Sequence, residues 1–354
     1  MDGVDGVLAD IAPGRPPVIL AEASSPMPAN LRANLLALNS SGADEIHQAA
    51  LATRELVYIY AQVVAGLLYR ADDCDTSRIT AIGAHGQTVR HRPELGYTTQ
   101  LNDPALLAEL TGISVIADFR SRDVAAGGQG APLVPAFHAA QFQSDEPTAV
   151  LNLGGIANVT ILRPGQSPIG FDTGPANVLL DLWAARHLGR SYDQDGQWAA
   201  SGTVLPDLLN ELIQSEPWLA LPPPKSTGRD LFNAPWLDER LSRIGNDLAP
   251  QDVQATLQRY TATTVANALA QHAPDVTRVL VCGGGAQSAG LMRDLASCLP
   301  CPVMSTDDAG VPAQSVEALA FAWLAWAHVN RVPAGLPSVT GSRGARVLGA
   351  YYPA

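Results

Sequence analysis

The stretch Asn152-Leu-Gly-Gly-Ile-Ala-Asn158, followed closely by Phe171-Asp-Thr-Gly-Pro-Ala-Asn177, decides the fold class. Apolar runs on both sides of Gly154-Gly155 predict two strands, over 149–153 and 156–162, joined by a tight hairpin. A third strand is expected to end at Asp172, and a helix over 176–188 follows. This order predicts an α/β domain with an acid on a strand end beside a glycine turn. A general base working next to a bound phosphate needs such an arrangement.

The Gly154-Gly155 turn allows two interpretations. Two glycines between apolar strands are common in plain hairpins. Here the polar side chains of Asn152 and Asn158 flank the turn, which favours contact with a phosphate. A second turn, Gly283-Gly284-Gly285, follows an apolar strand. It fits either a strand-to-helix connection or close backbone approach to a flat ligand such as adenine, and it lacks the Gly-x-Gly-x-x-Gly spacing of dinucleotide sites.

Composition excludes several classes of protein. The chain has 354 residues, 47% of them hydrophobic, and a net charge of −12. That charge argues against a nucleic-acid partner, which needs a basic surface. We see no apolar run long enough to span a bilayer and no signal peptide in residues 1–20, so we expect no membrane partner and a cytoplasmic location.

The order of elements occurs twice. A strand, a hairpin, a helix and a further strand are expected from near residue 1 and again from near residue 147. We therefore predict two α/β domains, residues 1–145 with part of the tail (331–354) and residues 146–330, with a central cleft as the common place for a ligand. The polar stretch 144–147 suits a hinge.

Lysine and cysteine usage narrows the chemistry. The single lysine, Lys225, is not preceded by the glycines of a Walker A loop, and no protein-kinase motifs are present. Phosphate must then be held by backbone amides, hydroxyls, arginine and a metal. Cys298 and Cys301 have the C-x-x-C spacing but no matching second pair, which favours a structural role over zinc or redox chemistry.

Two polar stretches in the first half could bind a ligand. His85-Gly-Gln87-Thr88 ends a strand, and its histidine is either a hydrogen-bonded core residue or, with Gln87 and Thr88, part of a sugar-hydroxyl site. The stretch from Asp118 to Asp123 is either a solvated ion-pair loop or a site before the glycine-rich loop 127–130. Its arginines, Arg120 among them, could grip a carboxylate with two hydrogen bonds.

One acid stands in an otherwise apolar helix. Glu317 lies on the first turn of a helix expected over 314–329, where the helix dipole favours a negative charge. An acid flanked by apolar residues otherwise needs a partner. The sequence leaves both readings open.

These motifs together carry a resemblance that covers nearly the whole chain. It resembles the anhydro-N-acetylmuramic acid kinase family, of the actin/sugar-kinase/Hsp70 type of fold, in which two α/β domains close on ATP. The motifs that carry it are Met1-Asp-Gly-Val-Asp5, His85-Gly-Gln-Thr88, Ala117-Asp-Phe-Arg-Ser-Arg-Asp-Val-Ala-Ala-Gly-Gly-Gln-Gly-Ala-Pro132, Asn152-Leu-Gly-Gly-Ile-Ala-Asn158, Phe171-Asp-Thr-Gly-Pro-Ala-Asn177, Lys225-Ser-Thr-Gly-Arg229 and Cys282-Gly-Gly-Gly285.

The resemblance implies a reaction that uses ATP, Mg²⁺ and water. Water opens the 1,6-anhydro ring of the amino sugar while O6 takes the γ-phosphate, which gives N-acetylmuramic acid 6-phosphate and ADP. The family serves the recycling of peptidoglycan fragments.

The resemblance also implies roles for individual residues. Asp172 would take a proton from the attacking water, and Glu317 would act on the substrate side. Arg120 would hold the lactyl carboxylate of the sugar, and His85 and Asp118 would also bind the substrate. The remaining implied roles are phosphate contact by Gly154, Gly155 and Asn158, adenosine contact by Gly283, Gly284 and Gly285, and orientation of Mg²⁺ by Asp2.

One departure leaves alternatives open. The family has Ser-Gly-Thr-Ser directly before the residues with which this sequence begins, and those residues form a phosphate turn. We expect that the true start lies upstream. The alternatives are a catalytically impaired relative that still binds sugar or nucleotide, and a sugar kinase that leaves the ring intact. Oligomeric state is open too, and the helix expected over 251–273 could supply the interface of a homodimer.

Overall fold

Two α/β units make up the chain in the structure, a computed structural model that describes residues 3–71, 74–245 and 247–354. Unit 1 is Met1–Gln141 with Glu317–Ala354, and unit 2 is Phe142–Val316. The predicted α/β class is confirmed. The division differs from the expected boundaries, because the helix over 316–329, which we placed in the second domain, groups with unit 1.

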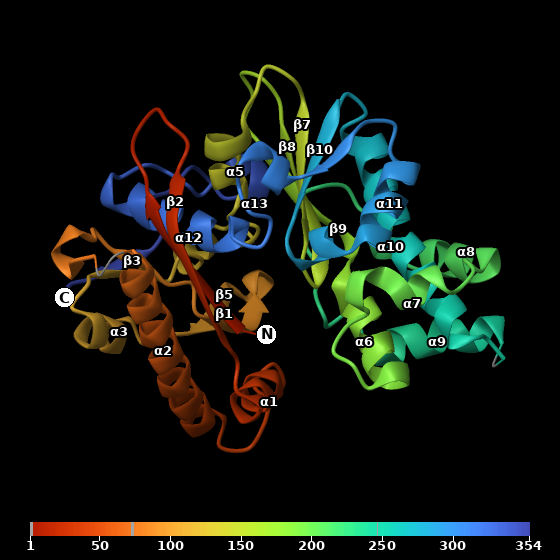
Figure 1. Cartoon of the computed structure of the whole chain (residues 1–354), viewed down its shortest axis with the longest axis horizontal. Coiled ribbons are helices and arrows are strands. Elements are labelled where there is room, and N and C mark those ends of the chain that lie inside the picture. Colours follow the sequence, from red (N-terminus) through yellow and green to blue (C-terminus); the bar gives the residue numbers. More distant parts are fainter. Residues whose placement is uncertain (1–2, 72–73, 246) are drawn as a thin grey trace. The chain divides into compact units, whose positions relative to one another are not determined.

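Unit 2 is built on a five-stranded mixed sheet of order β11-β10-β7-β8-β9 (Figure 1). The predicted hairpin forms its centre: β7 pairs with β8, and β8 with β9, both antiparallel. Strand β10 runs parallel to β7 and to β11. The strands are β7 (Thr148–Leu153), β8 (Ile156–Leu162), β9 (Ile169–Pro175), β10 (Arg278–Cys282) and β11 (Val303–Ser305).

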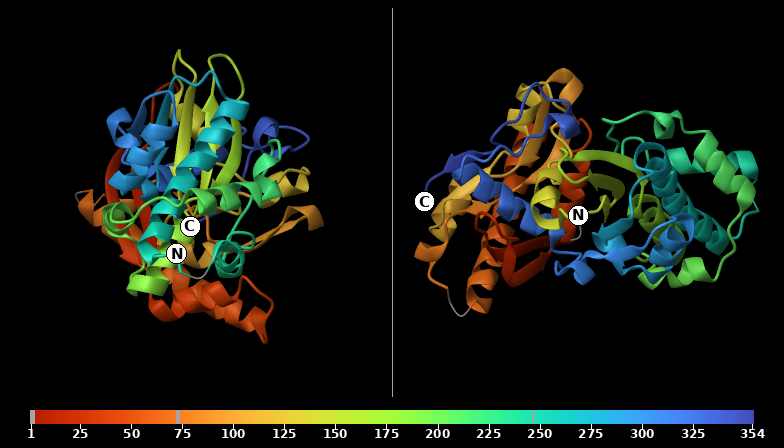
Figure 2. Two further views of the ribbon diagram at one scale, coloured as in Figure 1. Left: turned by 90° about the vertical axis from the view of Figure 1, so that its right-hand side faces the viewer. Right: turned by 90° about the horizontal axis from the view of Figure 1, so that it is seen from above.

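Alternating apolar residues attach helices to one face of this sheet. Every second side chain of β7 and β8 enters one core cluster, as the two-residue period of a strand requires. Helices α10 (Pro250–His272) and α11 (Ala289–Cys298) cover that face, as the turned views in Figure 2 also show. Helix α10 is largely buried within its own unit, and a homodimer interface on it stays a prediction.

The proline- and glycine-rich segment 190–235 contributes to a second core. It contains helical pieces held around Trp236, Phe232 and Tyr260. The helices of this part of unit 2 are α6 (Asn177–Leu188), α7 (Gln197–Ala200), α8 (Pro206–Gln214) and α9 (Ala234–Ile244), with short 3₁₀ turns at Gln194–Gly196 and Pro217–Ala220. Further 3₁₀ turns of the unit lie at Gly284–Gln287 and Thr306–Ala309.

Unit 1 combines three small sheets with helices. Strands β1 and β2 form the predicted N-terminal hairpin, β12-β6-β3 a three-stranded sheet, and β4-β5 a second hairpin. The strands are β1 (Gly3–Asp10), β2 (Val18–Pro26), β3 (Ile82–Gly83), β4 (Gln87–Arg92), β5 (Tyr97–Leu101), β6 (Val115–Ala117) and β12 (Ala350–Tyr352). The helices are α1 (Ala29–Ala37), α2 (Glu45–Arg70), α3 (Pro104–Thr111), α4 (Ser121–Ala125), α5 (Pro135–Phe142), α12 (Val316–Val329) and α13 (Pro337–Thr340), with 3₁₀ turns at Thr76–Arg78 and Pro93–Leu95.

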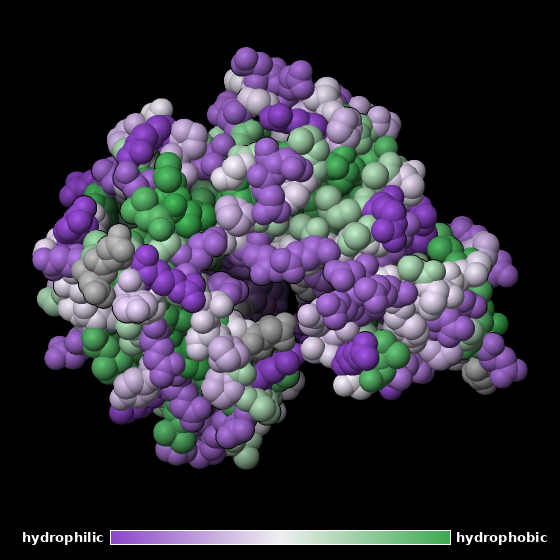
Figure 3. Space-filling view, viewed as in Figure 1, coloured by the Kyte–Doolittle hydropathy of each residue, from purple (hydrophilic) through white to green (hydrophobic). Residues whose placement is uncertain are grey.

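The long helix α2 corrects one expectation. By length and composition alone it is apolar enough to cross a membrane, contrary to our reading of the sequence. In the structure its buried side chains, among them Val63 and Leu67, pack on the β1–β2 hairpin. Its apolar residues that face outward are interspersed with polar ones on the viewed face of unit 1 (Figure 3). The helix therefore buries one side against unit 1 and leaves the rest of its surface outside that core.

Helix α12 and the tail complete unit 1. Phe321 of α12 contacts the rings of His85 and Phe119, with centroids 4.6 and 5.5 Å apart. Strand β12 pairs with β6. The buried carboxylate of Asp123 accepts hydrogen bonds from Gly130 N at 2.8 Å and Thr340 Oγ1 at 2.8 Å, which ties the glycine-rich loop to the tail. The stretch from 118 to 123 is therefore not a solvated ion-pair loop.

Candidate functional site

Three polar residues lie side by side on β7, β8 and the edge strand β9 of unit 2. Asn152 of β7 stands opposite Asn158 of β8, which in turn stands opposite Asp172 of β9. This groups the predicted base with a residue predicted to face phosphate. We expected Asp172 at the end of its strand, and this was wrong. Strand β9 continues to Pro175, which pairs with Ile156.

A β-bulge adjoins Asp172. The pairing register shifts between Ala157 and Asn158, so that Thr173 of β9 has no opposite residue on β8. Thr173 Oγ1 instead donates to the Ala157 carbonyl at 3.3 Å. Bulges bend a strand and re-aim its side chains, and they are over-represented next to active sites.

A distant segment holds the carboxylate of Asp172. The side chain is 8% exposed. Its Oδ2 accepts a hydrogen bond from the backbone N–H of Thr227 at 2.8 Å. The backbone N–H of Asp172 donates to the carbonyl of Lys225 at 3.1 Å. The stretch Lys225-Ser-Thr-Gly-Arg229, to which sequence reasoning gave no role, therefore lies directly against the predicted base.

Backbone hydrogen bonds from the start of α6 hold the Gly154-Gly155 turn. The Gly155 carbonyl accepts from Ala176 N and Val178 N at 2.9 and 3.0 Å, and the Gly154 carbonyl accepts from Asn177 N at 3.0 Å. A Cβ added at either glycine would meet nothing closer than 3.7 Å. Space therefore remains in front of both glycines, as close approach of a ligand would require.

Arg229 lies beside this turn. Its Nη2 is 3.7 Å from the place that a Cβ on Gly155 would take. Within the described residues, its guanidinium makes no hydrogen bond or ion pair, although its backbone carbonyl accepts from Asn233. An exposed, unpaired guanidinium beside a glycine turn can bind an anion. Sequence reasoning missed Arg229, and its place in the Lys225–Arg229 motif was the signal available.

The three glycines after β10 differ in whether a side chain would fit at their position. A Cβ on Gly283, whose φ is +81°, would lie 2.3 Å from Asn152 Oδ1, and one on Gly285 would lie 2.6 Å from Leu153 Cβ. Both are required by packing against the end of β7. Gly284 is exposed, and a Cβ there would meet only Asn177 Nδ2 at 3.8 Å. Of the predicted adenosine contacts, Gly284 alone is open to a ligand.

In unit 1, the structure brings His85 and Arg120 together. Arg120 Nε donates to His85 Nε2 at 2.9 Å, and Arg120 Nη1 donates to the Gly130 carbonyl at 2.7 Å. Because Nε2 accepts, the proton of a neutral imidazole sits on Nδ1, which donates to the Gly86 carbonyl at 2.6 Å. Burial, and then the charge of Arg120, lower the pKa of His85 to about 3. The histidine orients Arg120 as a neutral acceptor.

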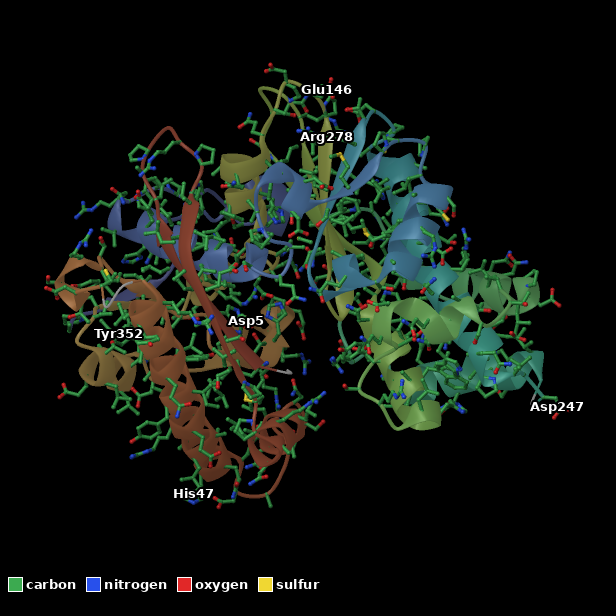
Figure 4. All side chains as sticks on the ribbon, viewed as in Figure 1. Asp5, His47, Glu146, Asp247, Arg278 and Tyr352 are labelled. Carbon is green, nitrogen blue, oxygen red and sulfur yellow. The ribbon has the colours of Figure 1, made fainter. Side chains whose placement is uncertain are left out.

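Glu317 belongs to the same neighbourhood. Its side chain is exposed on the first turn of α12, while the surrounding protein atoms displace enough water to raise its pKa. The charge of Arg120 opposes that shift, and the charge of Asp5 adds to it. Asp5, labelled in Figure 4, lies on β1, and its own pKa is raised by burial. Unit 1 thus combines two carboxylates and a fixed guanidinium.

The other predicted sugar contacts are half-buried or exposed. Gln87 Nε2 donates to the Thr88 carbonyl, and Thr88 Oγ1 accepts from Gln100 Nε2, both at 3.2 Å. Asp118 is exposed directly after β6 with φ +55°, a backbone region that non-glycine residues seldom adopt. Its Oδ1 accepts from Ser121 Oγ at 2.5 Å. Strained residues of this kind cluster at functional sites.

Metal ligands are sparse in the part of the chain that the structure describes. No group of three or more His, Cys, Asp or Glu side chains there could hold a metal ion. The predicted ligand Asp2 lies outside the described residues. Cys298 and Cys301 are free thiols, and Cys298 Sγ accepts from Arg259 Nη1 at 3.1 Å.

Comparisons with known proteins cover the full length of the chain. A model of the family "Anhydro-N-acetylmuramic acid kinase" matches residues 1–354. A curated relative of that name from Bordetella petrii is 67% identical over 355 residues, 100% of this chain and 94% of the relative. One from Burkholderia orbicola is 55% identical over 360 residues, with coverage of 100% and 94%.

Solved structures are more distant. The activator of the 2-hydroxyisocaproyl-CoA dehydratase from Clostridium difficile is 13% identical with a TM-score of 0.45, over 89% of this chain and 88% of that one. The ROK hexokinase from Thermus thermophilus is 15% identical with a TM-score of 0.35, over 90% and 98%.

The two glycines Gly283 and Gly284 should respond differently to alanine. Gly283→Ala forces Cβ into Asn152 at a positive φ, so the free energy of unfolding should fall by about 1–3 kcal/mol. Gly284→Ala should change it by less than about 0.5 kcal/mol yet weaken ATP binding several-fold by filling the open space. Urea unfolding and calorimetric titration measure the two quantities. Unchanged ATP affinity in Gly284→Ala would remove this residue from the nucleotide site.

The protonation state of His85 can be measured directly. Its folded pKa lies below the unfolded value near 6.5, so its contribution to stability is complete above pH 6.5 and is lost as the pH falls towards 3. In an NMR titration of the folded protein, the His85 imidazole should stay neutral at pH 5 with the proton on Nδ1. The urea-unfolded chain is the control, where all imidazoles should titrate near 6.5. Protonation of His85 near pH 6.5 in the folded protein would contradict the assigned hydrogen bond with Arg120.

Proposed function

The chain belongs to the anhydro-N-acetylmuramic acid kinase family, and we propose that it opens the 1,6-anhydro ring of this amino sugar with water while it transfers the γ-phosphate of ATP to O6. The observation that carries the proposal is the placement of Asp172. A nearly buried carboxylate, with one oxygen held by Thr227 N, lies one strand from Asn158 and the Gly154-Gly155 turn. The full-length match to kinases favours this activity over a binding protein without catalysis.

Asp172 supplies the base that the reaction needs. It would take a proton from water as the water oxygen bonds to the anomeric carbon and the bond from that carbon to O6 breaks. O6 then bonds to the γ-phosphorus, and the bond from phosphorus to the ADP oxygen breaks. One water is consumed and one proton is released for each sugar 6-phosphate and ADP, so the step balances.

The phosphates would be held by backbone and by an arginine. The open face of Gly154-Gly155 lets the backbone approach an anion, and Arg229 beside Gly155 would stabilise charge that develops on the transferred group. Gly284 would lie against the adenosine. Arginine clamps of this kind are among the larger contributions to phosphoryl transfer.

Unit 1 would recognise the sugar. The guanidinium of Arg120, fixed in its plane by His85 and Gly130, suits the lactyl carboxylate of the substrate. Glu317, whose raised pKa makes it a better proton holder, would bind a sugar oxygen. Gln87, Thr88 and Asp118 would contact hydroxyl groups.

Mg²⁺ would accompany the nucleotide. Kinases hold this ion through phosphate oxygens, waters and one or two carboxylates rather than an all-protein cage. The ion supplies charge neutralisation for the phosphates, and Asp2 is its proposed protein ligand. We place the reaction in the cytoplasm, where ATP is present.

The proposed base can be tested by one isosteric change. Asp172→Asn keeps an acceptor for Thr227 N–H but cannot take a proton, so turnover should fall by at least about 10²-fold with sugar affinity changed little. Coupled detection of ADP release measures turnover, and it should depend on the anhydrosugar. Asp238→Asn is the control, since Asp238 is an exposed acid of unit 2 paired with Arg186. Full turnover in Asp172→Asn would remove the assigned role.

A further inference from the structure

A buried ionic cluster anchors the loop that reaches Asp172. Glu216 and Arg240 are each 7% exposed and lie 3.4 Å apart. Glu216 Oε2 also accepts from Trp236 Nε1 at 2.8 Å, and its Oε1 accepts from Trp218 N at 3.2 Å. A buried carboxylate satisfied in this way fixes the backbone that it binds. The start of the Pro217–Ala220 turn is thereby held to the core of unit 2.

Three contacts pass from this turn to the Lys225–Thr227 segment. Trp218 Nε1 donates to the Ser226 carbonyl at 3.1 Å. Lys225 Nζ donates to the Leu219 carbonyl at 2.8 Å and lies 4.6 Å from the centre of the Trp218 ring. The ammonium group is thus held by a carbonyl and an aromatic face, an arrangement that stabilises a cation out of bulk water.

The same segment makes the two backbone hydrogen bonds to Asp172. Thr227 N–H holds Oδ2, and the Lys225 carbonyl accepts from Asp172 N. We infer that Lys225 is a positioning residue for Asp172: its ammonium group locks the 225–227 segment onto the Trp218 turn and keeps a positive charge beside the carboxylate. This inference rests on the proposed function of Asp172 as the base.

Charge supports the geometry. Burial lowers the pKa of Lys225, and the charge of Asp172 opposes that shift, so each group favours the ionised form of the other. The charge of Lys225 also acts on His272, whose pKa is lowered first by burial and then by that charge. Asn158, opposite Asp172, carries no charge.

The plainer alternative is that Lys225 only stabilises the fold as a cation over Trp218. The two roles differ in what the pH–rate profile does. A base that loses a neighbouring cation ionises at higher pH, whereas a merely loosened loop lowers turnover at every pH alike.

Kinetics of Lys225 variants separate these roles. Lys225→Met should lower kcat about ten- to hundredfold and move the acidic limb of the pH–rate profile up by roughly one pH unit. Lys225→Arg keeps the positive charge, so the acidic limb of its pH–rate profile should lie close to that of the unchanged protein. Arg186→Met is the matched control, because Arg186 also lies over a tryptophan of unit 2, Trp183, and it should leave both quantities unchanged. A lowered kcat with an unmoved limb would overturn the inference.

A spectroscopic test needs no activity. Lys225 is the only lysine of the chain, so lysine-selective ¹³C labelling gives one side-chain signal. In Asp172→Asn this signal should titrate at lower pH than in the unchanged protein, because the carboxylate that favours the ammonium is gone. Trp218→Phe keeps an aromatic ring but removes the hydrogen bond to Ser226. In this background, Asp172→Asn should shift the lysine titration by less. An unchanged titration in Asp172→Asn would overturn the coupling, whereas an active Asp172→Asn enzyme would instead overturn the proposed function.

Discussion

The register of β8 between β7 and β9 is the constraint on which the candidate site depends. Side chains alternate between the two faces of a sheet, so a slip of one residue would send Asp172 to the opposite face. The paired positions of Asn152, Asn158 and Asp172 hold the three polar groups together. The tight Gly154-Gly155 turn sets the register between β7 and β8. The bulge at Thr173 shifts the register between β8 and β9 by one residue, which places Asp172 opposite Asn158.

A segment distant in the sequence adds to the sheet in holding the Asp172 carboxylate. Thr227 is 55 residues from Asp172 in the sequence, and the loop that carries it is fixed by Glu216 and Trp218. Unit 1 follows the same principle, since His85 reaches Arg120 across 35 residues. In each unit, a residue distant in the sequence holds a polar group of the candidate site by a hydrogen bond.

Local signals in the sequence predicted many of the helices and strands but none of these long-range contacts. The double glycine between apolar runs predicts the β7–β8 hairpin, which the structure contains. Asp172 was misplaced at a strand end because the apolar run stops at Phe171, while backbone pairing continues. Helix α9 was missed, although Pro235 near its start and the Asn233 cap are typical of the beginning of a helix. The Thr227–Asp172 bond leaves no local pattern, because it is fixed only when the chain folds.

The central claim is that a carboxylate-activated water opens the sugar ring as O6 is phosphorylated. The direct measurement is turnover in H₂¹⁸O with mass spectrometry of the sugar 6-phosphate. The account predicts one ¹⁸O atom in the product at the anomeric carbon, measured early enough to precede exchange of the free sugar, and none in the transferred phosphate. A phosphorylated product that contains no ¹⁸O and keeps the anhydro ring would contradict it.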